Sequence, residues 1–286
     1  MRFVSYLSKS GPRLAGVRED GYVDLNRADP GIPAAAKAFL ADGPALVSRA
    51  WDALQRGEAI PPDQVRLLAP VPDPQKIICV GLNYADHAAE TGAKVGDEPV
   101  IFNKFPTALA AHGDTIQLPK VGADVDFEAE LVAVIGVGGK NISREAALDH
   151  VAGYACGHDV SARDWQKDKP GGQWLLGKSF DGFAPLGPEL VTADEVGDPH
   201  TLDIQLRVNG QVMQESNTEQ LIFSVDVLVS YISQVCTLLP GDLIYTGTPS
   251  GVGMGRKPPV YLKAGDVVEV EIEKLGVLRN PVGVEA

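Results

Sequence analysis

The sequence predicts an α+β fold that is mainly β, in which a small N-terminal α/β unit precedes a larger β-rich body. Short apolar runs of strand length recur along the body, and the 31 glycines and 21 prolines fall mostly between them, as turns require. Helical segments are few and short, and they do not alternate regularly with the strands. A doubly wound parallel sheet, which needs such alternation, is therefore disfavoured.

Residues 1–70 form the predicted N-terminal unit. Short alternating runs predict strands at residues 2–7, 13–17 and 21–25, and an Ala-rich stretch predicts a helix over residues 33–56. The segment 69–74 then contains three prolines, each of which removes a backbone donor and restrains its predecessor. We place the domain boundary there, so that residues 71–286 form the second domain.

The body is predicted from apolar runs bounded by turn residues. The expected strands cover residues 76–81, 100–103, 127–136, 151–160, 201–208, 242–246 and 267–273. The expected helices cover residues 84–91, 143–150 and 224–235.

The charge balance excludes some classes of partner. The chain carries 25 Lys and Arg against 38 Asp and Glu residues, a net charge of −13, which repels phosphate backbones, so we expect no nucleic-acid partner. No apolar run approaches the ~18 residues of a membrane span and no signal-peptide pattern opens the chain, so we expect no membrane partner and a cytoplasmic location. An anionic small substrate stays compatible with this charge, because a bound metal reverses the local field.

Three carboxylates stand where strands meet the core. Glu128 and Glu130 lie two apart on a strand and therefore point the same way, just before a continuous apolar run. Asp159 ends another apolar strand. Three carboxylates without His or Cys form an all-oxygen site that suits Mg²⁺, Mn²⁺ or Ca²⁺ better than zinc. The alternative is that Glu128 and Glu130 form the solvent face of an edge strand.

A short helix carries a second candidate group. His87 and Glu90 are three residues apart, hence neighbours on one helical face, and Asn83 is a plausible N-cap. A carboxylate that orients an imidazole makes a general base able to activate water. The alternative is an ordinary surface ion pair.

Other polar residues follow the third carboxylate. Arg163 and Gln166 are suited to bind a substrate carboxylate or carbonyl. Lys178 lies among small residues, a setting for stabilising an oxyanion, although an ordinary surface lysine is the alternative. The segment 241–253 is a strand that leads into a glycine-rich loop; it lacks the Gly-Lys-Thr ending of a phosphate-binding loop, so Thr248 is expected to line a small-molecule pocket instead.

The order of these motifs resembles the fumarylacetoacetate hydrolase superfamily over residues 75–280, and most closely its branch named fumarylacetoacetate hydrolase domain-containing protein 2. The matching motifs are G-L-N-Y-x-x-H-x-x-E, D-F-E-x-E-L, G-x-D-V-S-A-R-D-W-Q, G-K-S-F-D and Y-T-G-T-P-x-G-V-G. The resemblance implies rolled, mainly β sheets in a sandwich-like arrangement around a metal site, and usually a homodimer.

The resemblance also assigns roles to the candidate residues. It implies that the three carboxylates ligate Mg²⁺ or Mn²⁺, that His87 and Glu90 form a water-activating pair on a lid segment, and that Lys178 stabilises an oxyanion or enolate. It implies substrate contacts for four residues, namely Tyr84, Arg163, Gln166 and Thr248.

The expected function is metal-dependent hydrolysis of a C–C bond in a 2,4-diketo acid or acylpyruvate, giving pyruvate or another 2-keto acid plus a second acid. Relatives that act only as hydratases commonly lack the His–Glu pair, so its presence favours hydrolysis or decarboxylation. The alternative is an oxaloacetate decarboxylase or keto–enol tautomerase that uses the same metal-stabilised enolate. A non-catalytic keto-acid or metal-binding protein on the same scaffold is a further alternative.

Overall fold

A mixed 12-stranded sheet runs through the computed structural model of the chain, which describes residues 1–285. Its strands are β1 (Arg2–Ser8), β2 (Gly11–Arg18), β3 (Gly21–Asp24), β4 (Ala59–Ile60), β5 (Leu67–Leu68), β6 (Ile77–Gly81), β7 (Val100–Lys104), β8 (Leu109–Ala110), β11 (Ala129–Ile135), β12 (Val151–His158), β14 (Ala184–Thr192) and β17 (Leu243–Tyr245). Their main order is β4-β3-β2-β1-β14-β12-β11-β17-β6-β7. β11 and β12 lie in the middle of this order, and β11 is buried along its whole length, as its continuous apolar run predicts.

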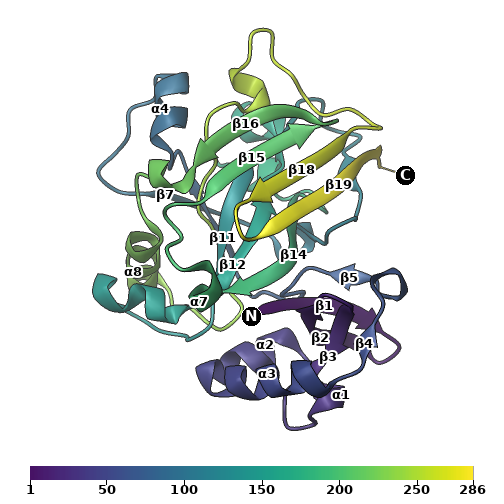
Figure 1. Cartoon of the computed structure of the whole chain (residues 1–286). Coiled ribbons are helices and arrows are strands. Elements are labelled where there is room, and N and C mark those ends of the chain that lie inside the picture. The colour runs from purple at the N-terminus through teal and green to yellow at the C-terminus, as the bar shows by residue number, and fades with distance from the viewer. Residues whose placement is uncertain (286) are drawn as a thin grey trace.

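A second sheet of five strands packs across β11, β12 and β14 (Figure 1). Its strands, in spatial order, are β16 (Gln211–Asn217), β15 (Asp203–Val208), β18 (Val267–Ile272), β19 (Gly276–Val284) and β9 (Ile116–Leu118). Alternate residues of β15 and β18 face the first sheet, so that one face of each strand is buried. A two-stranded ribbon of β10 (Val125–Asp126) and β13 (Ser161–Ala162) lies directly beside the candidate carboxylates in sequence.

The helices are short and lie around the sheets (Figure 1). They are α1 (Leu25–Ala28), α2 (Ala36–Ala41), α3 (Val47–Arg56), α4 (Ala85–Thr91), α5 (Arg163–Lys167), α6 (Leu175–Lys178), α7 (Ala193–Val196) and α8 (Val225–Val235), with 3-10 turns η1 (Gly43–Leu46), η2 (Pro62–Gln64), η3 (Pro106–Ala108), η4 (Arg144–His150), η5 (Thr218–Gln220) and η6 (Gly253–Gly255). Within the part of the chain that is described, no helix is long and apolar enough to cross a membrane.

The predicted α+β, mainly β fold is confirmed, and each of the seven strands expected in the body is present within three residues of its predicted ends. Some helices differ from the prediction. The helix expected over residues 33–56 is divided into α2, η1 and α3, because Gly43-Pro44 interrupts the regular hydrogen bonding. The helix expected over residues 143–150 is the 3-10 helix η4.

Three long strands were not expected from the sequence, namely β14, β16 and β19. β14 contains Pro185, Gly187 and Pro188, which are turn signals in a sequence but are accommodated here at a register shift against β12. β16 and β19 carry polar residues on their exposed faces and lack a continuous apolar run.

The N-terminal unit, purple in Figure 1, is joined to the body by its first strand. β1 pairs antiparallel with β14, with Arg2 opposite Val191, so the sheet continues from one part of the chain into the other. The main apolar cluster likewise includes residues of both parts, such as Phe3 and Leu190. The boundary predicted at residues 69–74 therefore marks a change in sequence within one continuous sheet.

Candidate metal centre

The antiparallel pairing of β11 and β12 brings the three candidate carboxylates together. Ala129 lies opposite His158, so the preceding Glu128 and the following Asp159 are adjacent, and the Asp159 N–H donates to the Glu128 carbonyl oxygen at 2.9 Å. One carboxylate oxygen each from Glu128, Glu130 and Asp159 lies within 4.8 Å of the others. All three side chains are buried, with Glu128 only 6% exposed, so the alternative of a solvent-facing edge strand is wrong.

Three cationic side chains surround this triad. Lys178 Nζ donates to Glu128 Oε2 at 2.7 Å and to Asp159 Oδ2 at 2.9 Å, and Arg163 Nη2 donates to Glu128 Oε1 at 2.6 Å. Lys104 Nζ lies 2.6 Å from Asp159 Oδ1. Lys178 is 2% exposed, so the alternative of an ordinary surface lysine is also wrong.

These cations compensate the carboxylates unequally. Burial disfavours the charge of Glu128, but the nearby Lys178 and Arg163 outweigh it and hold the pKa of Glu128 well below its usual range. Glu130 accepts a hydrogen bond from the Gly247 N–H at 2.8 Å, yet it forms no ion pair with any lysine or arginine in the described residues. Burial, together with repulsion from the other two carboxylates, raises the pKa of Glu130 well above its usual value. The centre therefore lacks positive charge next to Glu130.

Buried polar atoms around the triad lack partners in the described part of the chain. The Tyr84 hydroxyl and His158 Nε2 receive or donate no hydrogen bond, whereas Asp159 Oδ1 is in an ion pair with Lys104. Lys104 Nζ also contacts three carbonyl oxygens, those of Val160, Lys178 and Phe183. Burial and the positive charge of Lys104 lower the pKa of His158 to about 3, so this imidazole stays neutral. An unpartnered hydroxyl and a carboxylate without a cationic partner fit a hard divalent cation, which binds oxygen ligands.

Helix α4 carries the predicted His–Glu pair. His87 Nδ1 lies 3.2 Å from Glu90 Oε2, and both side chains are partly exposed. The predicted N-cap is wrong, because Tyr84 occupies the cap position. Asn83 is buried instead, where its amide donates to the carbonyl oxygens of Phe223 and Thr246. A buried side-chain amide that bridges two backbones restricts the position from which α4 starts.

A glycine-rich loop, residues 247–255, connects α4 with the triad. Gly247 donates to Glu130, and Gly251 donates to Glu90 at 3.0 Å. Gly251 has a φ of +99°, and a Cβ there would lie 2.3 Å from the Met213 carbonyl oxygen, so only glycine fits this close approach. One loop therefore contacts both Glu90 of the His87–Glu90 pair and Glu130 of the carboxylate triad.

The predicted substrate contacts have partners within the protein. Arg163 donates from Nη1 to Gln166 Oε1 at 2.9 Å and from Nε to Asp126 Oδ2 at 2.8 Å, in addition to its bond with Glu128. Its guanidinium is therefore positioned to hold Glu128 in place. Thr248 Oγ1 accepts a hydrogen bond from Gln214. Substrate contact by these residues and by Tyr84 stays a prediction.

Three buried residues that organise the site were not expected from the sequence. Asp126 accepts hydrogen bonds from the Gly253 and Met254 N–H groups, in addition to that of Arg163. Its position in the D-F-E-x-E-L motif was a usable signal, whereas Lys104 and Gln214 stand in segments with no chemical pattern.

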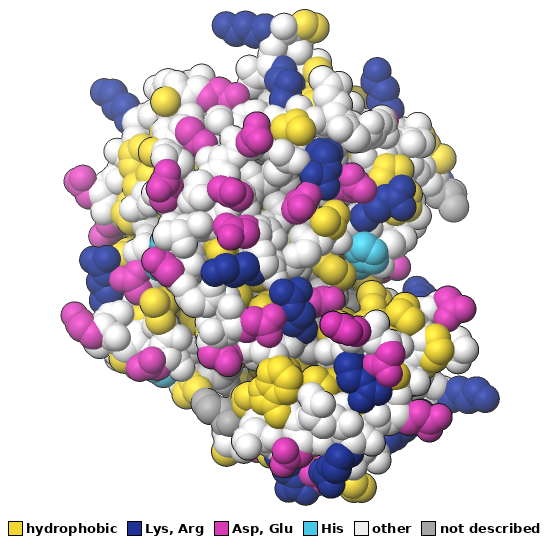
Figure 2. All heavy atoms as spheres, viewed as in Figure 1, with side chains coloured by type: hydrophobic (Ala, Val, Ile, Leu, Met, Phe, Trp, Pro, Cys, Tyr) yellow, Lys and Arg dark blue, Asp and Glu magenta, His cyan; other side chains and the backbone are white. Residues whose placement is uncertain are grey.

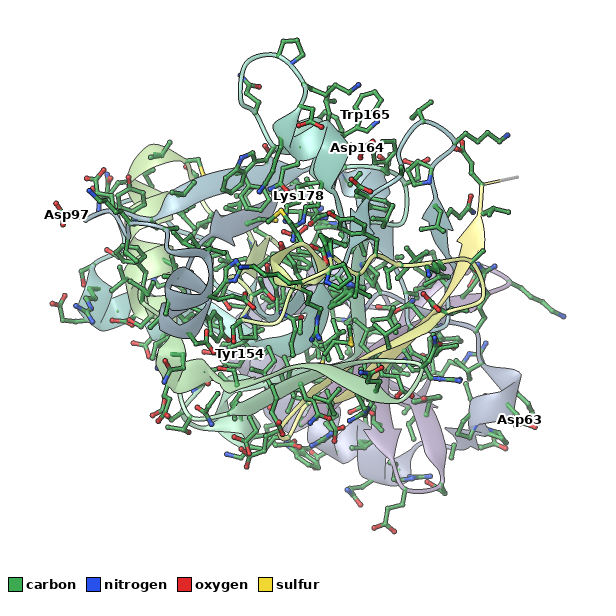
Figure 3. All side chains as sticks on the ribbon, turned by 90° about the horizontal axis from the view of Figure 1, so that it is seen from above. Asp63, Asp97, Tyr154, Asp164, Trp165 and Lys178 are labelled. Atoms are coloured by element: carbon green, nitrogen blue, oxygen red, sulfur yellow. The ribbon has the colours of Figure 1, made fainter. Side chains whose placement is uncertain are left out.

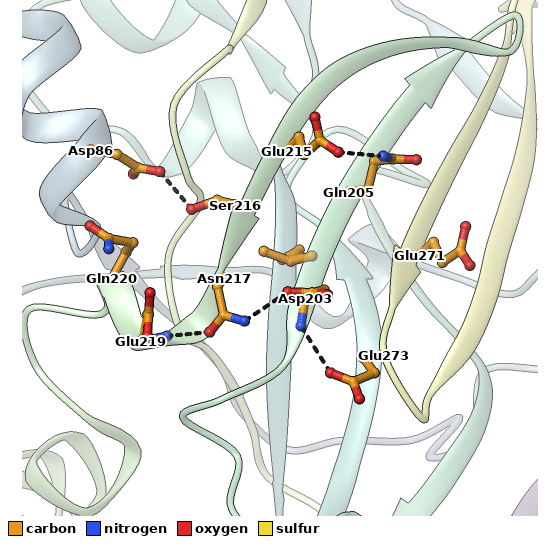
Figure 4. Close-up of a pocket in the computed structure, with 11 residues that line it drawn as sticks. Asp86, Asp203, Gln205, Glu215, Ser216, Asn217, Glu219, Gln220, Glu271 and Glu273 are labelled. Atoms are coloured by element: carbon orange, nitrogen blue, oxygen red, sulfur yellow. Dashed lines mark hydrogen bonds between the residues drawn. The ribbon is translucent and has the colours of Figure 1, made fainter.

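A hollow of about 790 Å³ lies away from the triad, beside the start of α4. Figure 4 shows Asp86 on α4 reaching Ser216 on β16, a hydrogen bond of 2.6 Å. The hollow is lined by six carboxylates, and acidic side chains gather over this face of the molecule in Figure 2. None of the predicted site residues lines this hollow. Asp86, the neighbour of His87 in the sequence, does line it.

Known proteins are similar to this chain over nearly its whole length. An oxaloacetate tautomerase of Xenopus laevis is 50% identical over an alignment of 287 positions, which covers 99% of this chain and 90% of that protein. The solved structure of a fumarylacetoacetate hydrolase from Exiguobacterium antarcticum is 35% identical, with a TM-score of 0.85 and full coverage of both chains. A maleylpyruvate hydrolase from Sphingobium sp. SYK-6, solved with a manganese(II) ion and pyruvate, is 34% identical, with a TM-score of 0.84 and full coverage of both chains.

The cytoplasmic location expected from the sequence is contradicted by these comparisons. The tautomerases of Xenopus laevis, Bos taurus and Homo sapiens that are similar to this chain are all named as mitochondrial proteins. The expectation rested on the lack of a membrane span and of a secretory signal pattern, and neither property separates one aqueous compartment of a cell from another.

A family model matches most of the chain. The model described as the fumarylacetoacetate (FAA) hydrolase C-terminal domain covers residues 76–283, a range that contains all the predicted site residues. The sheet arrangement, the buried carboxylate triad and the near-complete coverage by relatives agree with this match. The chain therefore belongs to the fumarylacetoacetate hydrolase family.

Proposed function

We propose that this protein is a divalent-metal-dependent enzyme that interconverts the keto and enol forms of oxaloacetate. The C–C bond hydrolysis expected first from the sequence is the weaker candidate, because the relatives that are 50% identical are named oxaloacetate tautomerases. The observation in the structure that carries the proposal is the charge arrangement at the triad. Glu130 has no cationic partner among the described residues, while Lys178 stands between the other two carboxylates.

Glu128, Glu130 and Asp159 would hold Mg²⁺ or Mn²⁺, with their buried oxygens as ligands. When bound, the cation supplies Lewis-acid stabilisation of negative charge on the 2-keto oxygen of the substrate. The manganese ion in the structure of the maleylpyruvate hydrolase supports this choice of metal.

The side chains around the triad supply the remaining functions. Tautomerisation removes a proton from C3 and adds one to the 2-keto oxygen. His87, oriented by Glu90, is the base for the carbon-bound proton, and Lys178 stabilises the charge that develops on oxygen. The hydrogen bond from Gly251 to Glu90 holds α4 against the glycine-rich loop.

Hydrolysis of an acylpyruvate is the second candidate, and the His87–Glu90 pair favours it. In that reaction the same imidazole deprotonates a water molecule that attacks the distal carbonyl carbon, and the C–C bond breaks to release an enolate. The similar fold of a maleylpyruvate hydrolase supports this candidate.

We also propose that the protein is a homodimer. The outer edge of β7, the last strand of the long sheet, is unpaired within the described residues, and Val100, Ile101 and Phe105 along it are exposed. Val235 at the end of α8 lies beside them and is 79% exposed. An apolar sheet edge is the kind of surface that a second copy covers.

The test compares three substrates with metal-stripped protein to which Mg²⁺ or Mn²⁺ is added: oxaloacetate, an acylpyruvate and a 2,4-diketo-3-deoxy sugar acid. We expect the absorbance of enol-oxaloacetate to change faster than without protein, with no release of pyruvate. Glu128→Ala and His87→Ala should lose this activity by about 100-fold or more. Pyruvate and CO₂ from oxaloacetate would identify a decarboxylase, and pyruvate plus a second acid from the other substrates would identify the hydrolase.

A further inference from the structure

Gln214 on β16 is a buried amide whose orientation is determined by its bonding partners. It is 1% exposed. Its Oε1 accepts from the Ala129 N–H at 2.8 Å, while its Nε2 donates to Thr248 Oγ1 at 2.8 Å and to the Pro249 carbonyl oxygen at 2.9 Å. The Ala129 N–H can only donate and the Pro249 carbonyl can only accept, so the amide has a single possible orientation.

This orientation determines what the Thr248 hydroxyl does. Because its oxygen accepts from Gln214, its hydrogen is left to donate, and no oxygen in the described part of the chain accepts it. Thr248 is 5% exposed, and a buried donor without an acceptor costs free energy. The adjacent Gly247 donates to Glu130, so the residue that carries this free donor directly follows a residue that contacts the carboxylate triad.

Gln214 also reaches the strand that carries two of the triad residues. Gln214 accepts a hydrogen bond from the N–H of Ala129, which stands between Glu128 and Glu130 in the sequence. One neutral side chain from the second sheet therefore restrains both the metal-binding strand and the loop that carries Thr248. A residue needed only for packing would not require a donor on the side of Thr248 and an acceptor on the side of Ala129.

We propose that Gln214 is a positioning residue that holds the Thr248 hydroxyl as a hydrogen-bond donor toward the carboxylate of a bound 2-keto acid. The site then binds a 2-keto acid, whose carboxylate accepts this hydrogen bond, more tightly than it binds the neutral ester of the same acid. The ligand class rests on the proposed function, whereas the direction of the Thr248 hydrogen bond rests on the contacts of Gln214 alone.

The test measures pyruvate and methyl pyruvate binding to Mn²⁺-loaded protein by calorimetry. Gln214→Glu replaces the donating amide with a carboxylate that accepts the Thr248 hydrogen and withdraws it from the ligand. We expect the Kd of pyruvate to rise by about 10- to 100-fold, the value of one hydrogen bond to a charged group, and the preference over methyl pyruvate to shrink. Gln211→Glu, an exposed change of the same type on the same strand, is the matched control and should leave both values unchanged.

Two further variants separate positioning from packing. Thr248→Ser keeps the hydroxyl and should bind pyruvate within about twofold of the original protein, whereas Thr248→Val should match the loss in Gln214→Glu. Adding Gln214→Glu to Thr248→Val should cost no more than about twofold further. Unchanged binding in Gln214→Glu, an equal loss in Thr248→Ser and Thr248→Val, or a preference for methyl pyruvate in the original protein would overturn the proposal. If Gln214→Glu fails to fold, the Thr248 pair decides.

The same experiment distinguishes this proposal from the proposed function. Binding is measured without turnover, so a protein that binds pyruvate through Thr248 but leaves oxaloacetate unchanged would contradict only the tautomerase. A kinetic comparison adds a second readout, because a positioning role for Gln214 predicts a higher KM for oxaloacetate with a smaller change in kcat.

Discussion

Glu130 differs from its two neighbours at the level of single residues. Glu128 and Asp159 each contact a lysine, and Glu128 contacts Arg163 as well, whereas in the described residues Glu130 is held only by a backbone N–H. A buried carboxylate next to two others is destabilising until a cation neutralises it. The same residue is therefore unfavourable for the metal-free protein and necessary for the metal-bound one.

Glu130→Gln should have opposite effects on stability and on metal binding. Removal of the uncompensated charge should raise the free energy of unfolding of the metal-free protein by about 1–3 kcal/mol, while Mn²⁺ affinity should fall by more than about 100-fold. Thermal unfolding with and without Mn²⁺ measures both effects. Glu128→Gln is the matched comparison. It leaves Lys178 and Arg163 without the negative charge that they contact, so it should destabilise the metal-free protein. A destabilised metal-free Glu130→Gln protein would contradict this account.

At the level of elements, α4 is attached to the body through a few polar contacts. Asp86 accepts from Ser216 at 2.6 Å and from the Ser250 N–H at 3.3 Å, and Glu90 accepts from Gly251. Only Ala88 of α4 is a buried residue, so apolar packing contributes little to its position. Polar contacts at the surface are weak enough to break and reform, which suits a segment that must admit substrate.

Asp86→Ala should loosen α4 without unfolding the protein. Loss of its bonds to Ser216 and Ser250 should lower kcat/KM by about 5- to 100-fold and speed amide hydrogen exchange over residues 85–91. Ser216→Ala should produce a smaller change in the same direction. The control is Asp97→Ala, on the exposed loop that follows, which lies at the edge of the molecule in Figure 3. Equal exchange in the Asp86 and Asp97 variants would exclude this role.

The N-terminal unit is held by a buried carboxylate. Asp24, at the end of β3, accepts from the Tyr6 hydroxyl on β1, from Arg13 on β2 and from the Arg27 N–H in α1. Burial opposes the charge of Asp24, but these hydrogen bonds and the charge of Arg13 outweigh it, and the pKa of Asp24 lies below its usual value. Three strands and a helix therefore depend on one ionised group.

The stability of this unit should depend on pH in the acidic range. Because the pKa of Asp24 is lower in the folded than in the unfolded protein, its contribution is complete above the unfolded value of about 3.9 and is lost as pH falls through the folded value. Asp24→Asn should cost about 2–4 kcal/mol at pH 7, and the difference from the original protein should shrink below about pH 4. Denaturant titrations at both pH values measure it. A difference that grows toward low pH would have the wrong sign.

For the whole molecule, the proposed dimer predicts a mass of twice the 30.3 kDa chain by sedimentation. Ile101→Glu with Val235→Glu should produce monomers, because two charges in an apolar contact cost several kcal/mol in desolvation. Leu7→Glu, at an exposed apolar residue of the N-terminal unit, is the control and should remain dimeric. A monomeric original protein would exclude the dimer. A dimeric protein with both Ile101→Glu and Val235→Glu would place the interface elsewhere.

The sequence by itself determined the fold class, seven of the strands of the body and the residue types of the triad. β11 and β12 were predictable because a continuous apolar run has one physical meaning in a sheet, burial on both faces. The motifs that surround Glu128, His87 and Lys178 also indicate the family, because they occur together and in a fixed order along the chain.

Only the tertiary structure decided how charge and hydrogen bonds are distributed around the triad. Lys104 and Gln214 are far from the carboxylates in sequence, and a polar residue in a strand carries no local sign of whether it is buried or exposed. Arg163, expected at the substrate, has its donors directed to Asp126, Glu128 and Gln166. A local sequence pattern shows only the periodicity of apolar and polar residues. The compensation of a buried charge depends on side chains that are distant in sequence and that the pairing of strands brings within about 3 Å of it.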